Sequence, residues 1–73
     1  MPFGRLADRV ARAVRLAERP GRSFRVEAVR RGPSDGSILV TDAAAPGRYA
    51  FVEVRAGRLP PDFRAELDAF LAG

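Results

Sequence analysis

Five amino-acid types that carry much of protein chemistry are absent from this 73-residue sequence: cysteine, histidine, lysine, asparagine and glutamine. Without cysteine the chain can form no disulfide and offers no thiol nucleophile, and without cysteine and histidine the usual zinc-finger sites are excluded. Histidine is also the side chain that most often serves as a general base near neutral pH. These absences remove most of the familiar catalytic constellations.

The acids and hydroxyls that remain do not suggest an active site. No two of the nine acids stand out as a buried acid–base pair, and Glu66 and Asp68 fall on the outer side of a predicted helix. The serines have no histidine or lysine to activate them, and no GK[ST] follows the turn-forming stretch Gly32 to Gly36. We therefore predict a protein that is not an enzyme, with no catalytic residues, no cofactor, no metal site and no small-molecule substrate.

Length and composition indicate one small globular domain over residues 1–73. About half of the residues are apolar and 30% are charged, which is typical of a folded chain, but at this size a core has little stability to spare. No apolar run is long enough for a membrane span or a signal peptide, so a cytoplasmic protein is expected. A GC-rich genome accounts for the use of arginine alone as basic residue, and the missing amides also fit a thermophile-like composition.

The stretch from Arg5 to Arg19, RLADRVARAVRLAER, is the most informative part of the chain. At roughly 100° per residue, Leu6, Val10 and Val14 fall on one face of a helix, the spacing of a core-facing stripe. The opposite face carries a row of arginines, which we call the arginine ridge: Arg5, Arg9, Arg12, Arg15 and Arg19. Asp8 is the one acid among them, placed for an i,i+4 pair with Arg12. Leu16 interrupts the ridge and is expected to be exposed or covered by a partner.

Three interpretations of the ridge remain open. It can be an ordinary solvated helix face, or a surface that docks polyanions, since guanidinium groups bind phosphate in bidentate fashion and stay charged. A membrane-surface helix is disfavoured because the apolar face is built of small alanine and valine residues. The sequence also predicts an uneven charge distribution, with nine of the 13 arginines at or before Arg31.

From Ser23 onward the period changes to two, which predicts three antiparallel strands in a meander over about Ser23 to Arg31, Ile38 to Thr41 and Tyr49 to Ala56. The stretches Gly32 to Gly36 and Asp42 to Arg48 are read as the connecting loops. A last helix begins near Pro60 and Pro61, with its apolar stripe at Phe63, Leu67, Phe70 and Leu71. The predicted fold class is α+β: a two-layer α-β-β-β-α sandwich with the second strand in the middle and both helices on one sheet face.

This arrangement assigns every second strand residue to a core face, namely Phe24, Val26, Ala28, Ile38, Val40, Ala50, Val52 and Val54. The other face then carries an apolar group, which we call the outer sheet patch: Val29, Leu39, Tyr49 and Phe51. Such a patch is too apolar for idle exposure. It can bury itself against a second copy, stack single-stranded bases on Tyr49 and Phe51 between Arg25 and Arg55, or bind another protein chain.

The order of elements is similar to that of the double-stranded RNA-binding domain. That family has a lysine-rich start to its second helix, where this chain has Pro60, Pro61 and Asp62, so we assign the chain to no family. The sequence predicts a small interaction or accessory protein whose partner is itself, as a homodimer. The alternative is sequence-indifferent binding of DNA or RNA through the arginine ridge.

Overall fold

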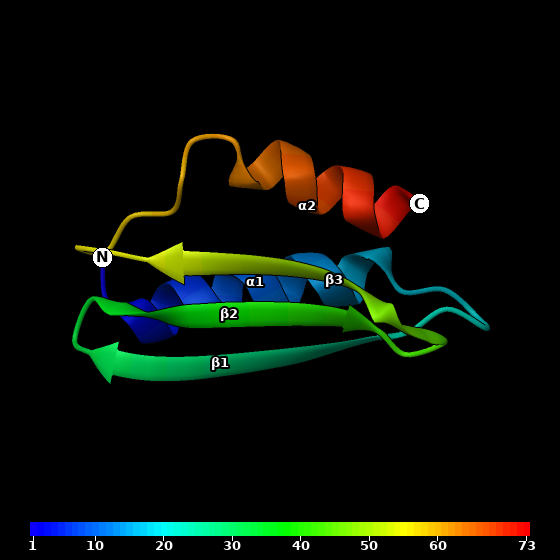
Figure 1. The fold of residues 1–73 in the computed structure, drawn as a ribbon, viewed down its shortest axis with the longest axis horizontal. Coiled ribbons are helices and arrows are strands. Elements are labelled where there is room, and N and C mark those ends of the chain that lie inside the picture. The colour runs from blue at the N-terminus through cyan, green and yellow to red at the C-terminus, as the bar shows by residue number, and fades with distance from the viewer.

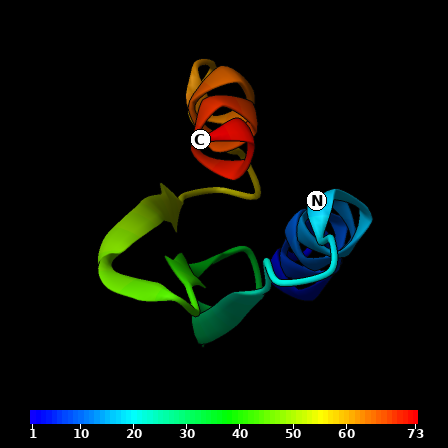
Figure 2. The ribbon, with the colours of Figure 1, turned by 90° about the vertical axis from the view of Figure 1, so that its right-hand side faces the viewer.

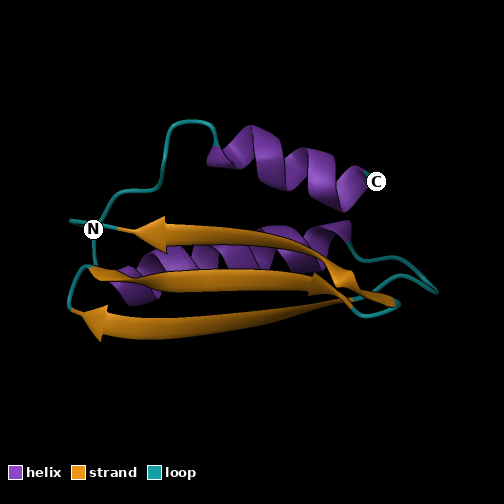
Figure 3. Cartoon of the chain, in the orientation of Figure 1, coloured by secondary structure: helices purple, strands orange, loops and turns teal.

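The computed structural model describes all residues from 1 to 73 and has five elements in the order helix, three strands, helix (Figure 1). They are α1 (Phe3–Ala17), β1 (Phe24–Gly32), β2 (Asp35–Asp42), β3 (Ala45–Val54) and α2 (Phe63–Ala72). The strands form one antiparallel sheet in the order β1-β2-β3, and both helices lie on the same side of it (Figures 2 and 3). The predicted α+β fold is confirmed.

The sheet register follows from the alternation of apolar residues. Val26 lies opposite Val40, and Val40 lies opposite Ala50, so these side chains share the face that the helices cover. One residue further along, Glu27, Leu39 and Phe51 form a row on the other face. A shift of one residue in either pairing would move apolar side chains from the core to solvent, which is why this pattern specifies the register strongly.

The core is small and comes from four of the five elements. It consists of ten buried apolar residues: Phe3, Leu6, Val10 and Val14 of α1, Ile38 and Val40 of β2, Val52 and Val54 of β3, and Phe63 and Leu67 of α2. No residue of β1 is fully buried, and Phe24 and Val26 only pack against the edge of this cluster. Ala28, predicted to face the core, has the expected register opposite Ile38, but it is exposed on the edge strand β1.

Helix α1 ends two residues before the predicted end at Arg19. The residue before a proline is biased away from the helical region, so Pro20 keeps Arg19 out of the helix. Glu18 is already extended, and its carboxylate accepts a hydrogen bond of 3.0 Å from the backbone N–H of Phe24.

The chain then reverses through Gly21, whose φ of 80° needs a residue without a Cβ atom. Arg19 and Arg22 close this turn with two backbone hydrogen bonds of 3.1 and 2.8 Å.

The two strand connections are shorter than predicted. Gly32 pairs with Asp35, so the first connection is a two-residue turn that begins with Pro33, a residue whose fixed φ suits this position. Asp42 pairs with Ala45, so only Ala43 and Ala44 form the second turn. The stretch from 45 to 48, expected to be loop, therefore belongs to β3, with an irregularity in the ladder next to Asp42.

Helix α2 starts at Phe63 rather than at the prolines. Pro61 disfavours a helical conformation for Pro60, and the first turn forms only after both. The N–H of Phe63 donates a hydrogen bond of 3.1 Å to the carbonyl of Pro60, which closes the turn that leads into the helix. Of the predicted stripe, Phe63 and Leu67 are buried, whereas Phe70 and Leu71 are only partly buried. Neither α1 nor α2 combines the length and the apolar character that a membrane crossing requires.

Candidate interaction surfaces

The arginine ridge lies on the side of α1 that faces away from the sheet. Leu6, Val10 and Val14 pack into the core, so the residues between them point outward, and all five arginines of the ridge are exposed. Arg5, Arg9, Arg12 and Arg15 belong to the helix itself, while Arg19 extends the row on the turn that follows. At a rise of about 1.5 Å per residue, the four helical arginines cover roughly 15 Å of the helix axis.

No arginine of the ridge takes part in an ion pair. The structure has six ion pairs, and they involve Arg22, Arg25, Arg31, Arg48, Arg55 and Arg64. The predicted pair between Asp8 and Arg12 is not formed. The other exposed i,i+4 pair of the chain, Arg64 with Asp68, does form, at 3.3 Å.

The ridge borders a surface lined by charged residues alone. Asp8 and the four helical arginines border an open, shallow hollow of about 600 Å³. Leu16 lies near the C-terminal end of α1 and is 82% exposed, as its position in the pattern predicted. A surface of this kind suits a large charged partner rather than a small ligand, because nothing encloses it.

The outer sheet patch lies on the face of the sheet that no helix covers. Tyr49 and Phe51 of β3 are 62% and 50% exposed, and Val29 of β1 is 56% exposed. Leu39 of β2 lies between the strands and directly opposite Phe51, where its neighbours partly bury it. Leu39, Tyr49 and Phe51 lie together on β2 and β3, whereas Val29 of β1 lies diagonally from Leu39, beside Glu27, which is the residue directly opposite Leu39.

Charged residues flank the outer sheet patch and are paired with one another. On β1, Arg25 lies 3.8 Å from Glu27, and at the other end Arg31 lies 3.9 Å from Glu53 across the sheet. Glu53 also accepts a hydrogen bond of 2.9 Å from Arg55. An apolar centre with a polar rim is the usual anatomy of a protein–protein interface. Stacking of nucleic-acid bases on Tyr49 and Phe51 between Arg25 and Arg55 is less favoured, because both arginines already pair with a glutamate.

The two surfaces lie on opposite sides of the molecule. The ridge lies on the face of α1 that points away from the sheet, and the patch lies on the sheet face that points away from the helices. Figure 2 shows both helices on one side of the sheet. A partner on one surface therefore leaves the other free. The sequence alone could not establish this separation, because it depends on how the helix packs on the sheet.

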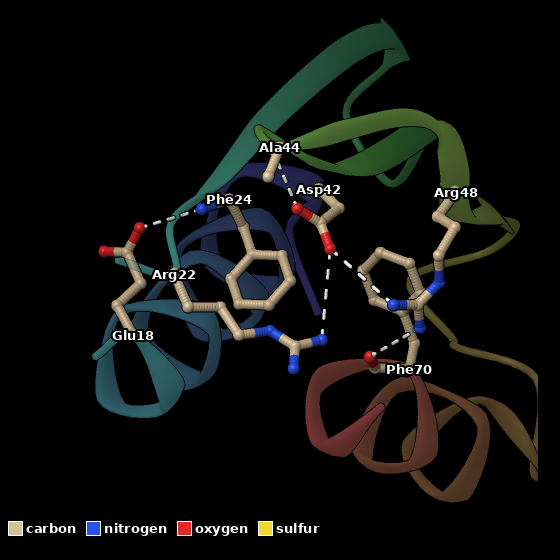
Figure 4. Close-up of polar contacts among 7 residues, drawn as sticks. All are labelled: Glu18, Arg22, Phe24, Asp42, Ala44, Arg48 and Phe70. Carbon is tan, nitrogen blue, oxygen red and sulfur yellow. Dashed lines mark hydrogen bonds and ion pairs between the residues drawn. The ribbon is translucent and has the colours of Figure 1, made fainter. Parts of the chain in front are cut away.

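A third charged cluster, around Asp42, was not anticipated (Figure 4). The Asp42 side chain is only 8% exposed and lies 3.9 Å from Arg22 and 3.6 Å from Arg48. Its Oδ1 atom accepts a hydrogen bond of 2.9 Å from the N–H of Ala44, which holds the β2–β3 turn. The one signal in the sequence was an acid directly after an apolar strand, and this acid was read as part of a loop.

Two aromatic rings complete this cluster. The guanidinium of Arg22 lies 5.5 Å from the ring centre of Phe24, that of Arg48 lies 5.3 Å from Phe70, and the two rings are 5.7 Å apart. Nη2 of Arg48 also donates a hydrogen bond of 3.4 Å to the carbonyl of Phe70 near the end of α2. Cations are favourable beside the C-terminal ends of helices. We read the cluster as a structural link between the sheet and α2.

Arg22 has donors that form no hydrogen bond within this cluster. Its Nε and Nη2 atoms are buried without a hydrogen bond, and the side chain borders a small cavity of about 120 Å³ with Ala17, Arg19, Leu71 and Ala72. Both helices end at this cavity, and their C-terminal carbonyls oppose the entry of an anion. The positive charge of the Arg22 guanidinium is already stabilised by the C-terminal ends of the helices, so this cavity is not an anion site.

Another hollow lies beside β3. It has a volume of about 580 Å³, and its lining includes Glu53, Arg55, Arg58, Leu59, Pro60, Pro61, Phe63 and Glu66. No three acids of the chain lie close enough together to hold a metal ion. Comparison with protein-family models, curated proteins and solved structures finds no match to this chain. Any functional inference therefore has to come from the surfaces themselves.

Proposed function

We propose that this protein is a cytoplasmic interaction protein that works as a homodimer, with the outer sheet patch as the interface. The observation that carries this proposal is the exposure of Val29, Tyr49 and Phe51 on one sheet face, by half or more each. Burial of these side chains in an interface removes their apolar surface from water, which stabilises the dimer by roughly 25 cal/mol for each Å² buried. The cytoplasmic location is the one expected from the sequence. As a binding protein, the chain needs no catalytic group.

A second copy of the same chain is the partner that this face suits best. The rim contains both signs of charge, Arg25, Arg31 and Arg55 with Glu27 and Glu53, so a two-fold arrangement can place opposite charges across the interface. Three strands of about eight residues give a face of roughly 25 Å by 15 Å. Two such faces bury roughly 750 Å² in total, less than the roughly 1,200 Å² of a stable specific interface, so a weak, transient dimer with a dissociation constant in the micromolar range or above is expected.

Sedimentation equilibrium over a wide concentration range tests the dimer. The wild-type chain should change from monomer to dimer across the micromolar range, and Tyr49→Glu with Phe51→Glu should stay monomeric because four carboxylates would meet in the interface. Leu16→Glu is the matched control, since it also places a carboxylate at an exposed apolar position but on α1. A wild-type chain that remains monomeric at several hundred micromolar rejects the proposal. Loss of the dimer in Leu16→Glu alone would move the interface to α1.

Sequence-indifferent nucleic-acid binding is a second candidate, and a separate observation favours it. None of the five ridge arginines has an intramolecular ion-pair partner, so no internal pair has to be broken before a phosphate binds. Four phosphate contacts from Arg5, Arg9, Arg12 and Arg15 predict a slope of roughly −3 to −4 in a plot of log affinity against log salt on duplex DNA. Sequence preference is not expected, because the ridge has no asparagine or glutamine to read adenine.

The salt dependence should change with each arginine removed. Arg9→Gln and Arg12→Gln should each reduce the slope by about one and weaken binding to all sequences alike. The double change Arg58→Gln with Arg64→Gln removes two exposed charges that lie outside α1, and its slope should stay at the wild-type value. No shift of DNA or RNA mobility at about 50 mM salt would reject this candidate, because phosphate contacts are strong under that condition.

A further inference from the structure

The arginine ridge and the outer sheet patch lie on opposite sides of the molecule, so a dimer that forms through the patches leaves both ridges exposed. We infer that the dimer is a bridge, in which two arginine ridges face opposite directions and hold two separate nucleic-acid duplexes together. The inference rests on both candidates proposed above. It adds a mode of action, namely the joining of two polyanions by one dimer rather than the coating of one.

The first step is the layer order of the dimer. If the outer sheet patches pack face to face, the two sheets become the inner layers and the two α1 helices become the outer layers. Because Leu6, Val10 and Val14 point toward the sheet, the arginines on the other side of α1 point out of the assembly. Dimer formation therefore leaves both ridges uncovered.

The second step is the distance between the ridges. Packed sheets lie about 10 Å apart, and a helix with its side chains is about 10 to 12 Å thick. Adding one sheet spacing and two helices puts roughly 30 to 35 Å of protein between the two ridges. Two binding surfaces that lie this far apart and face away from each other cannot meet the same side of one straight duplex.

The third step is the strength of a single ridge. Four phosphate contacts give weak, salt-dependent binding that releases easily. One dimer holds each duplex by a single ridge, and only when several dimers join the same two duplexes does each further contact become intramolecular and lengthen the lifetime of the joined complex. The expected activity is therefore the clustering of duplexes at low salt, with a strong dependence on protein concentration.

A capture assay tests the bridge. One duplex of about 30 base pairs, longer than the ridge, is fixed to beads, and a second duplex of unrelated sequence carries a fluorophore. Wild-type protein at a concentration where it is dimeric should bring the fluorescent duplex to the beads, and added salt should release it. The same samples are sedimented without DNA, so that dimer formation is measured independently.

Two variants separate the steps. Tyr49→Thr with Phe51→Thr removes the patch while keeping the net charge, so it should bind single duplexes with the wild-type salt slope and capture at least about tenfold less of the second duplex. Arg9→Gln with Arg12→Gln should remain dimeric, reduce the salt slope by about two, and weaken duplex binding and capture in parallel.

The outcomes are distinguishable. Wild-type protein that dimerises and shifts a duplex but captures no second one overturns the bridge and leaves the two proposed activities intact. Equal capture by the patch variant also overturns it, because the joining would not depend on the dimer. A wild-type chain that fails to dimerise, or fails to bind, removes the proposed function and the bridge together.

Discussion

At the scale of single residues, Asp42 has the most demanding environment. Its carboxylate is buried between Arg22 and Arg48 and also holds the turn through the N–H of Ala44. Asp42→Ala should lower the free energy of unfolding by about 3 kcal/mol, because two guanidinium groups would then face each other without an anion and the turn would lose its hydrogen bond. Thermal or denaturant unfolding measures this directly.

The control for this prediction is Arg22→Met, which keeps an apolar stem of similar length. Asp42 would retain Arg48 as its partner, and two buried donors without hydrogen bonds would disappear. The change in unfolding free energy should therefore stay below about 1 kcal/mol. Similar losses in both variants would mean that the cluster stabilises the fold through packing rather than through charge.

The phenylalanines test the extent of the core. Phe63 is only 4% exposed, so Phe63→Ala should cost about 3 to 5 kcal/mol, enough to unfold a domain of this size. Phe24 and Phe70 are only partly buried; they pack against the edge of the core, and each ring lies beside the other ring and an arginine guanidinium. Phe24→Ala should therefore cost clearly less, about 1 to 2 kcal/mol. If the two denaturation midpoints fell equally, the burial assigned to Phe24 would be wrong.

At the scale of elements, α1 carries two independent patterns on its two faces. Asp8 lies among the ridge arginines without an ion-pair partner, so its charge repels any phosphate that approaches the ridge. Asp8→Asn should strengthen nucleic-acid binding severalfold at low salt and leave the unfolding midpoint nearly unchanged. Titration of a labelled duplex at two salt concentrations provides the measurement. Unchanged affinity would indicate that phosphates do not bind beside Asp8.

The elements themselves were largely predictable, and their ends were not. Helix α1 is specified by its apolar stripe of Leu6, Val10 and Val14. Strands β2 and β3 are specified by alternating apolar residues, because a shift of one residue would expose these side chains to solvent. These residues are Ile38 and Val40 on β2, and Val52 and Val54 on β3. The ends depend on local competition. Pro20 and Pro61 act on the residues before them, and the Asp42 side chain converts a predicted loop into a two-residue turn.

The interaction surfaces were predictable only as separate residue sets. The arginine ridge and the outer sheet patch follow from periodicity, and the structure places the members of each set together. Their placement on opposite sides is a tertiary property. The cluster of Arg22, Asp42 and Arg48 escaped prediction because its members come from three different segments that meet only after the sheet and α2 have packed.

At the scale of the whole molecule, dimer formation should be visible in stability. Only ten residues form the core, and a second copy would bury the outer sheet patch as well. The melting temperature should therefore rise with protein concentration, since association favours the folded state by mass action. Differential scanning calorimetry at a low and a high concentration tests this. The Tyr49→Glu and Phe51→Glu double variant should show a melting temperature that does not depend on concentration.

The way α2 is attached sets the order in which the molecule opens. Its fully buried residues, Phe63 and Leu67, both lie in the first half of the helix, whereas the second half is held by partly buried side chains and the contacts of Arg48. In native-state hydrogen exchange, the amides near Phe70 should exchange first, those at the start of α2 next, and those of β2, which is paired on both sides, last. The C-terminal half of α2 is therefore expected to open and close many times during the lifetime of one folded molecule.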